Sequence, residues 1–307
     1  MPKILITGGA GFIGSHLVDA FIKRGYKVVV VDNLSTGRKK NFDPKAKFYK
    51  MDIQDKKLSG IFRREKFDFV SHHAAQIDVR LSVADPLFDA RVNILGSLNL
   101  LECCRRNKVK KIIFASSGGA MYGDTEVIPT PEDYPAKPCS PYGIAKVTVE
   151  HYLYYYKIEF GLPYVCLRYS NVYGPRQNSK GEAGVVAIFA DKMLNEVQPV
   201  INGAGKQTRD YVYVGDVVRA NLLALEKKVE GEFNVATTKE TSVNELFAKM
   251  VKILNRPFKE THGPAKSGEQ KRSCLSYEKI KKILLWQPAV GLDEGLELTI
   301  KWFKENI

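Results

Sequence analysis

The 307-residue sequence lacks several features that mark special classes of protein. No apolar run approaches the ~18 residues that a membrane-spanning helix requires. The five cysteines form no Cys-x-x-Cys pair and no metal-ligand spacing, which favours a reducing, cytoplasmic environment and no metal site. We find no internal repeat and no low-complexity linker. The first apolar strand begins at residue 3, so we also expect no signal peptide.

Acidic residues are scarce relative to basic ones. The chain has 34 Asp and Glu against 47 Lys and Arg, a net charge of +13. Such a surplus would suit a nucleic-acid binder, because basic surfaces attract phosphate. The lysines are nevertheless dispersed as short pairs, such as Lys56-Lys57 and Lys281-Lys282, and form no stripe with aromatic residues. We therefore expect a solvated lysine-rich surface, with neither nucleic acid nor membrane as a partner.

The N-terminal segment combines an apolar strand, a glycine-rich turn and a helix. It reads Lys3-Ile-Leu-Ile-Thr-Gly8-Gly-Ala-Gly11-Phe-Ile-Gly14. Gly8 permits the tight turn, Gly11 lets the backbone approach a pyrophosphate, and Gly14 lets the helix pack closely against the strand. The helix N-terminus adds unpaired N–H groups and the positive end of its dipole. The arrangement predicts a dinucleotide-binding site.

A second apolar strand ends at Asp32, and this acid bears on the choice of cofactor. Its carboxylate can accept hydrogen bonds from both hydroxyls of an adenine ribose, whereas it would repel a 2′-phosphate, so NAD is favoured over NADP. Arg38, Lys39 and Lys40 follow closely and would neutralise such a phosphate, which keeps NADP as the less favoured alternative.

Strand-like and helix-like segments alternate through the first half of the chain. This alternation predicts an α/β fold with a Rossmann-type, doubly wound parallel sheet. Beyond the two N-terminal strands, we expect strands at 48–52, 67–70, 112–115 and 164–168, and helices at 85–106 and 141–160. Shorter elements follow, with a strand at 231–235 and helices at 243–255, 276–284 and 292–305.

After residue 168 the regular alternation of strands and helices gives way to shorter elements, and this change predicts two domains. The first is an NAD-binding domain at 1–168, to which 212–236 returns. The second is a smaller, interleaved C-terminal α/β domain for the substrate, made of 169–211 and 237–307. Ligands of open α/β sheets bind at the carboxyl ends of the strands, so we expect the site between the two domains.

Tyr142 and Lys146 are the candidate catalytic pair. Their i, i+4 spacing on a helix places both side chains on one face. A free phenol has a pKa near ~10, so a tyrosine base at neutral pH needs its pKa lowered by roughly 3 units, about 4 kcal/mol. A nearby ammonium and a cationic nicotinamide ring both favour the phenolate.

These motifs resemble the extended short-chain dehydrogenase/reductases, in particular the UDP-galactose (UDP-glucose) 4-epimerases and related NAD-dependent sugar-nucleotide epimerases and dehydratases. The resemblance runs essentially end to end. It is carried by Thr7–Gly14, Asp32–Ser35, Asp52-Ile53, His72–Ala75, Asn93, the serine strand at Ser116-Ser117, Tyr142/Lys146, Leu167–Arg176 and Arg209–Val214.

The resemblance implies roles by position. Tyr142, Lys146 and Ser117 would be catalytic. The cofactor residues would be Gly8, Gly11, Phe12, Ile13, Gly14, Asp32, Asn33, Ser35, Asp52, Ile53, Ala74, Ala75, Asn93, Tyr142, Lys146 and Tyr169. The substrate residues would be Ser117, Tyr142, Asn171, Arg209, Lys266, Glu269 and Ser273.

Three positions depart from the family pattern. Gly118 stands where the catalytic hydroxyl is usual, and Ser117 is one residue early, so Ser117 or a water would replace that hydroxyl. Lys266 stands where an arginine is usual, which keeps the charge but loses bidentate geometry, and Arg272 would compensate. His73 replaces an apolar residue, and we interpret it as a core neighbour rather than a catalyst.

The activity that the resemblance implies is 4-epimerisation of a UDP-sugar. Tyr142 would deprotonate the sugar 4-hydroxyl while NAD takes the C4 hydride. The 4-keto sugar would rotate and receive the hydride on its other face, which interconverts UDP-glucose and UDP-galactose. Ser273 is small where a bulky residue would exclude an N-acetyl group, so N-acetylhexosamine forms are expected as well. A homodimer is also implied.

Other activities stay open at this point. A 4,6-dehydratase would normally carry Asp-Glu where this chain has Gly119-Ala120, which argues against one. A UDP-uronate epimerase or decarboxylase needs only one further basic contact. A cofactor-sensing regulator without catalysis would be expected to lack the pair Tyr142 and Lys146, which this chain retains.

Overall fold

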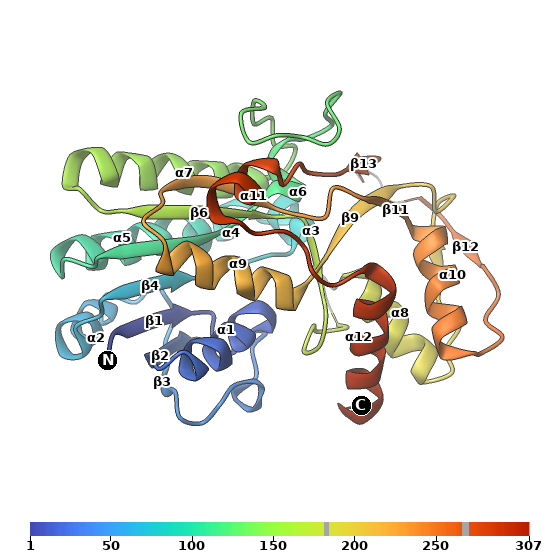
Figure 1. Ribbon diagram of the computed structural model, residues 1–307, viewed down its shortest axis with the longest axis horizontal. Coiled ribbons are helices and arrows are strands. Elements are labelled where there is room, and N and C mark those ends of the chain that lie inside the picture. The colour runs from blue at the N-terminus through green and yellow to red at the C-terminus, as the bar shows by residue number, and fades with distance from the viewer. Residues whose placement is uncertain (181–183, 266–269, 307) are drawn as a thin grey trace.

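Seven parallel strands form the main sheet of the computed structural model, which describes residues 1–180, 184–265 and 270–306 (Figure 1). Their order is β10-β6-β5-β4-β1-β2-β3. It reverses beside β1, which is the doubly wound topology that the sequence predicts. The strands are β1 Lys3–Thr7, β2 Lys27–Asp32, β3 Lys47–Lys50, β4 Phe69–His72, β5 Lys111–Ser117, β6 Tyr164–Tyr169 and β10 Gly231–Val235.

Helices cover both faces of this sheet because successive strand residues point to opposite sides. Ile4 and Ile6 belong to one core and Leu5 to the other. The first core is covered by α1 Phe12–Lys23, α9 Val214–Glu226 and α11 Glu278–Leu284. The second is covered by α2 Leu58–Glu65, α5 Gly96–Arg106 and α7 Pro141–Phe160. The sequence-based division places α11 in the substrate domain, whereas its apolar residues pack on the large sheet.

Helix α7 has the boundaries that the sequence predicts, and local chemistry explains them. The Ser140 hydroxyl accepts a hydrogen bond from the Gly143 N–H at 3.1 Å, and Pro141 occupies the first turn. The helix ends at Gly161, whose φ of 65° lies in the left-handed region. These ends fix the position of Tyr142 at the start of the helix.

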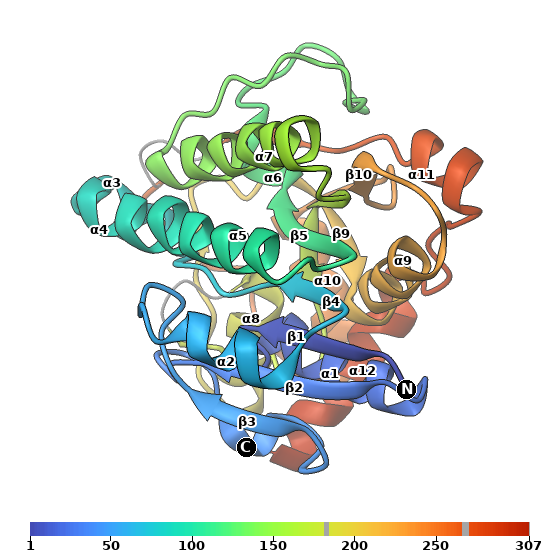
Figure 2. The ribbon, with the colours of Figure 1, turned by 90° about the vertical axis from the view of Figure 1, so that its left-hand side faces the viewer.

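The helix expected at 85–106 is interrupted. It consists of α4 Pro86–Ala90, a π-helical segment Arg91–Leu95 and then α5. A short helix, α3 Val79–Ala84, precedes it. Such π-helical insertions occur frequently at functional sites. In Figure 2, α3, α4 and α5 lie beside α7.

A smaller lobe lies beside the large sheet, on the right in Figure 1. Its sheet joins β7 Asn171–Tyr173, β9 Thr208–Tyr213, β11 Glu240–Ser242 and β13 Arg272–Ser273. A strand pair joins β8 Ile201–Asn202 and β12 His262–Gly263. Three helices pack around a separate apolar core: α8 Val185–Leu194, α10 Val243–Leu254 and α12 Leu292–Asn306. Among the described helices, none is long and apolar enough to cross a membrane.

Candidate functional site

A cleft of about 970 Å³ lies at the carboxyl ends of the central strands. The segments that follow β1, β2 and β4 line it, together with the ends of β5 and β6 and the start of α7. This is the edge where ligands of doubly wound sheets bind.

The glycine turn after β1 is packed too tightly for side chains. Gly8 has a φ of 70°, and a Cβ on it would lie 2.6 Å from the Ala74 nitrogen. A Cβ on Gly14 would lie 2.1 Å from the Gly8 carbonyl oxygen. No side chain caps the N-terminus of α1, and its first turn carries no acid. The first turn faces the cleft, so its N–H groups and positive dipole end suit the pyrophosphate of a dinucleotide.

Asp32 lies at the end of β2 in the cleft wall. Burial raises the pKa of its carboxyl, opposed by hydrogen bonds from the N–H of Leu34 and of Ala10. Beside it, the Asn33 amide donates to the Asp52 carboxylate at 2.8 Å. The two acids thus occupy one end of the cleft, where ribose hydroxyls would find acceptors.

Tyr142, Lys146 and Ser117 come together at the other end. The Lys146 ammonium donates to the Ala115 carbonyl at 2.9 Å and lies 5.6 Å from the centre of the Tyr142 ring. Burial lowers the pKa of Lys146 to about 8. Burial also raises the pKa of Tyr142 to about 12, opposed by the nearby Ser117 hydroxyl. Burial thus dominates the pKa of the phenol in the protein alone, and the lowering expected from the ammonium together with a cationic nicotinamide ring stays a prediction.

In this backbone, a side chain at position 118 would point at Leu275. A Cβ on Gly118 would lie 2.3 Å from the Leu275 Cδ1, inside a small buried cluster. Ser117 instead lies beside Tyr142 and lowers the pKa of its phenol. The hydroxyl that the sequence places one residue early thus reaches the phenol.

His73 is part of the cleft wall, and not only a core neighbour as the sequence interpretation has it. Its Nε2 lies 3.0 Å from the Tyr169 hydroxyl, which accepts from the Asn221 amide at 2.8 Å. Burial lowers the pKa of His73 to about 3, with the nearby Lys146 charge acting in the same direction. A neutral imidazole can therefore accept a hydrogen bond from the Tyr169 hydroxyl and hold that ring against the cleft.

Asn93 is the one predicted cofactor residue that does not line the cleft. It is buried in the π-helical segment and hydrogen-bonds the backbone of Gln76, which does line it. The remaining predicted cofactor residues all line the cleft: Gly8, Gly11, Phe12, Ile13, Gly14, Asp32, Asn33, Ser35, Asp52, Ile53, Ala74, Ala75, Tyr142, Lys146 and Tyr169.

Three predicted substrate residues meet in the smaller sheet. In the pairing of β9 with its neighbours, Ser273 lies opposite Arg209, and Asn171 lies opposite Tyr211. The Asn171 Oδ1 and the Ser273 Oγ both lie about 4 Å from the position of a Cβ on Gly119, at 3.8 and 4.0 Å. Asn171 and Ser273 thus lie near the segment that carries Ser117.

Two further predicted substrate residues, Lys266 and Glu269, lie outside the described residues. Arg272, expected to compensate for Lys266, forms an ion pair with Glu240. The Glu240 carboxylate thus already neutralises the Arg272 guanidinium.

Sequence reasoning missed several residues of the cleft. Arg176 lines it and donates to Asp19 of α1 at 2.7 Å. Trp302 and Phe303 of the C-terminal helix also line it. Arg176 ends a motif that the sequence analysis does quote, whereas the aromatic pair shows no local signal, because only tertiary packing brings α12 to the cleft.

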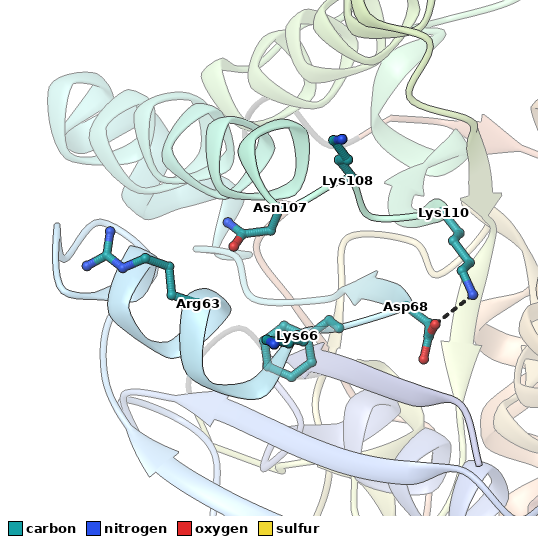
Figure 3. Close-up of a pocket in the computed structure, with 7 residues that line it drawn as sticks. Arg63, Lys66, Asp68, Asn107, Lys108 and Lys110 are labelled. Atoms are coloured by element: carbon teal, nitrogen blue, oxygen red, sulfur yellow. Dashed lines mark ion pairs between the residues drawn. The ribbon is translucent and has the colours of Figure 1, made fainter.

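A second cavity, of about 440 Å³, lies among residues that precede β4 and β5, at the opposite edge of the sheet (Figure 3). Lys66 and Lys108 stand at the C-terminal ends of α2 and α5, and Lys110 pairs with Asp68 at 2.8 Å. Basic side chains complement the negative ends of helix dipoles. We therefore ascribe these cations to helix stabilisation and not to the site.

Three comparisons relate this geometry to known proteins. The sequence model of the "NAD dependent epimerase/dehydratase family" matches residues 4–236. A crystal structure of a Thermotoga maritima UDP-glucose 4-epimerase with UDP-glucose is 50% identical with a TM-score of 0.97, and the match covers 99% of each chain. The Thermus thermophilus UDP-glucose 4-epimerase complex with NAD is 43% identical with a TM-score of 0.95, over 99% of this chain and 100% of that one.

A third structure extends the comparison to N-acetylated sugars. It is a UDP-N-acetylglucosamine 4-epimerase from Methanobrevibacter ruminantium in complex with UDP-N-acetylmuramic acid. It is 37% identical with a TM-score of 0.95, and the match covers 100% of this chain and 99% of that one.

Proposed function

Because the chain belongs to the NAD-dependent epimerase/dehydratase family, we propose that it is a UDP-sugar 4-epimerase that interconverts UDP-glucose and UDP-galactose. The observation that carries this proposal is the joint placement of Ser117, Tyr142 and Lys146 beside a cleft that begins at the glycine turn of α1. The two epimerases compared above share nearly the whole chain length with this protein.

The cleft fits NAD at both ends. The uncapped N-terminus of α1 would bind the pyrophosphate, and Asp32 with Asn33 would bind the adenine ribose. Lys146 would hold the nicotinamide ribose, and Tyr169, fixed by His73, would contact the nicotinamide end. Bound NAD supplies reversible hydride transfer at the sugar C4.

Tyr142 is the proposed base for the sugar 4-hydroxyl. Its pKa of about 12 in the buried site is too high for a base at neutral pH, so the charge of Lys146 and that of an oxidised nicotinamide must together favour the phenolate. Ser117 would bridge the phenol and the sugar oxygen, since its hydroxyl can donate and accept at once.

We assign substrate binding to the smaller lobe. Asn171 and Arg209 would hold the diphosphate, with an amide and a guanidinium as donors. Lys266 and Glu269 are proposed on sequence grounds. The domain division follows from the same assignment: residues 169–211 and 237–307 bind the UDP-sugar, apart from α11, while 212–236 supply α9 and β10 to the NAD-binding domain.

The sugar pocket favours a broad substrate range. Ser273 is small, and Gly119 opens toward it and toward Asn171. We infer that UDP-N-acetylhexosamines are accepted alongside UDP-glucose and UDP-galactose. The same glycine argues against a 4,6-dehydratase, because that reaction needs an acid where Gly119 and Ala120 stand.

An exposed apolar face supports a homodimer. On α4 and α7, side chains such as Leu87 and Ile158 are 70% and 65% exposed. Ile144, Tyr154 and Tyr155 of α7 are exposed as well. The helices concerned lie side by side in the upper left of Figure 2. We infer that a second copy of the chain covers this surface.

We place the enzyme in the cytoplasm and in galactose metabolism. All five cysteines are free, and four of them are buried, which suits a reducing compartment.

The test is incubation of the purified protein with UDP-galactose, UDP-glucose and their N-acetyl counterparts, followed by anion-exchange separation. Interconversion without net NADH, and its loss in Tyr142→Phe, is the expected result. Elimination or decarboxylation products, or UDP-sugar binding without turnover, would overturn the proposal in favour of the dehydratase, uronate or regulatory alternative.

A further inference from the structure

Asp89 is a buried carboxylate that neither the sequence analysis nor the proposed mechanism uses. It lies on α4, is 1% exposed, and stands between the π-helical segment and the loop that follows β4. Carboxylates are rarely fully buried unless they are paired with other groups, because removing the charge from water costs several kcal/mol. The groups around Asp89 must therefore compensate for this cost.

The Asp89 carboxylate holds part of the cleft wall in place. Its Oδ1 accepts from the Asn93 amide at 2.9 Å and from the Gln76 amide at 3.0 Å. Asn93 in turn donates to the Gln76 carbonyl at 2.9 Å and accepts from the Gln76 N–H at 2.9 Å. Asp89 thus orients Asn93, and Asn93 fixes the backbone of a residue that lines the cleft.

Both hydrogen-bond donors to Asp89 are neutral amides, so its charge is not cancelled by them. Burial raises the pKa of Asp89, while the two amides and the charge of Lys146 lower it. Helix α4 packs directly against α7, which carries Lys146 and Tyr142. In a low-dielectric interior such a charge acts on neighbouring groups more strongly than it would in water.

Asp89 acts electrostatically on both Tyr142 and Lys146. It raises the pKa of Lys146 against the effect of burial, and it also raises the pKa of Tyr142. The other groups facing the pair are Ser117 at Tyr142, and Glu150, Cys166, His72 and His73 at Lys146. Burial keeps both histidines neutral by lowering their pKa values, so they do not replace the carboxylate.

We propose that Asp89 is a positioning residue of the active site: its buried carboxylate fixes Asn93 and Gln76 in the cleft wall and places a negative charge against helix α7, which carries Lys146 and Tyr142. This inference rests on the proposed epimerase function for its catalytic meaning. Ionisation of the phenol then depends on additional positive charge in the cleft.

The variant that separates charge from hydrogen bonding is Asp89→Asn. An amide oxygen still accepts from Asn93 and Gln76, but the negative charge is gone. Asp89→Ser replaces it should Asp89→Asn fail to fold. Glu159→Gln is the matched control, because it removes one exposed carboxylate from α7, the helix of the catalytic pair.

The first measurement follows Lys146 itself and needs no activity. Lysines carrying ¹³C at Cε are titrated by NMR, and the Lys146 signal is assigned by its loss in Lys146→Met. The Lys146 signal in wild type is expected to titrate near its pKa of about 8. The midpoint should fall in Asp89→Asn and stay in place in Glu159→Gln. An unchanged midpoint in Asp89→Asn overturns the proposal.

The second measurement is the pH dependence of kcat with UDP-galactose. Removal of the negative charge lowers the pKa of both groups, so both limbs of the profile should move to lower pH in Asp89→Asn. A uniform loss of kcat with unshifted limbs would reveal a merely structural residue. If wild type has no epimerase activity but Lys146 still responds to Asp89→Asn, the proposed function fails while the electrostatic coupling stands.

Discussion

The Ser117 hydroxyl lies beside the Tyr142 phenol and lowers its pKa, although the two residues belong to different elements, β5 and α7. This contact predicts the effect of Ser117→Ala. We expect kcat with UDP-galactose to fall by roughly 10²-fold, the size typical of a proton-transfer partner, with little change in KM. Ser59→Ala, which removes an exposed hydroxyl from α2, is the control. An unchanged kcat would mean that a water molecule performs this role.

Gly118→Ala tests whether a side chain at position 118 would point at Leu275. The added methyl would meet the buried Leu275, so the free energy of unfolding should fall by about 1–3 kcal/mol in urea titrations. Combining it with Leu275→Ala should recover part of that loss. Strict additivity in the double variant would contradict the assigned contact. Gly60→Ala in α2, where nothing lies within 4 Å, should instead stabilise by up to ~1 kcal/mol.

Lys146→Met should stabilise the protein while abolishing activity. The pKa of Lys146 is lowered to about 8 in the folded state and lies near ~10.4 in an unfolded chain. Burial of the ammonium therefore destabilises the fold fully below pH ~8, and this cost disappears as the pH rises toward ~10.4. Measured by thermal unfolding, the advantage of Lys146→Met over wild type should shrink across that window. The exposed Lys23, changed to Met, should show no comparable trend.

Ser273→Tyr should narrow the substrate range. The side chain at this position lies near Gly119 and Asn171, where a tyrosine ring would occupy the space proposed for a C2 substituent. Turnover of UDP-N-acetylglucosamine should fall by at least roughly tenfold, with UDP-glucose turnover retained. Ser273→Ala, which keeps the pocket open, serves as the control. Equal rates for Ser273→Tyr and wild type on the N-acetylated sugar would remove the basis for this assignment.

Ile158→Lys should separate the proposed dimer. A charge in the middle of an apolar interface is costly to bury, so the variant is expected to elute as a monomer in size-exclusion chromatography with light scattering. Leu285→Lys makes the same change at another exposed leucine, after α11 on the large-sheet face opposite α7. That control should leave the assembly state unchanged. If the wild-type protein itself elutes as a monomer, the proposed interface is wrong.

Features with a local cause could be predicted from the sequence. The glycine turn, the acid at the end of β2 and the boundaries of α7 depend on residues next to one another in the chain, and the structure confirms them. The fold class follows from the same alternation of strands and helices, and the comparisons confirm it. The local pattern at Ser140–Tyr142 also determines where the helix begins.

Features that depend on distant residues could not be predicted in this way. The hydroxyl at Ser117 is explained only once Leu275, far along the chain, occupies the space beside Gly118. The influence of Asp89 needs α4 packed on α7, and the π-helical segment between α4 and α5 has no sequence signal that we can identify. The high pKa of the Tyr142 phenol likewise arises from burial, which the tyrosine–lysine spacing does not reveal.

The position of β10 affects how the protein is made. This edge strand, Gly231–Val235, pairs with β6, so the large sheet is finished by residues that lie beyond the first strands of the smaller lobe. During synthesis, residue 235 must therefore leave the ribosome before the large sheet is complete. Until then, one edge of β6 has no neighbouring strand. Truncated chains that stop short of β10 should consequently be the ones that chaperones retain.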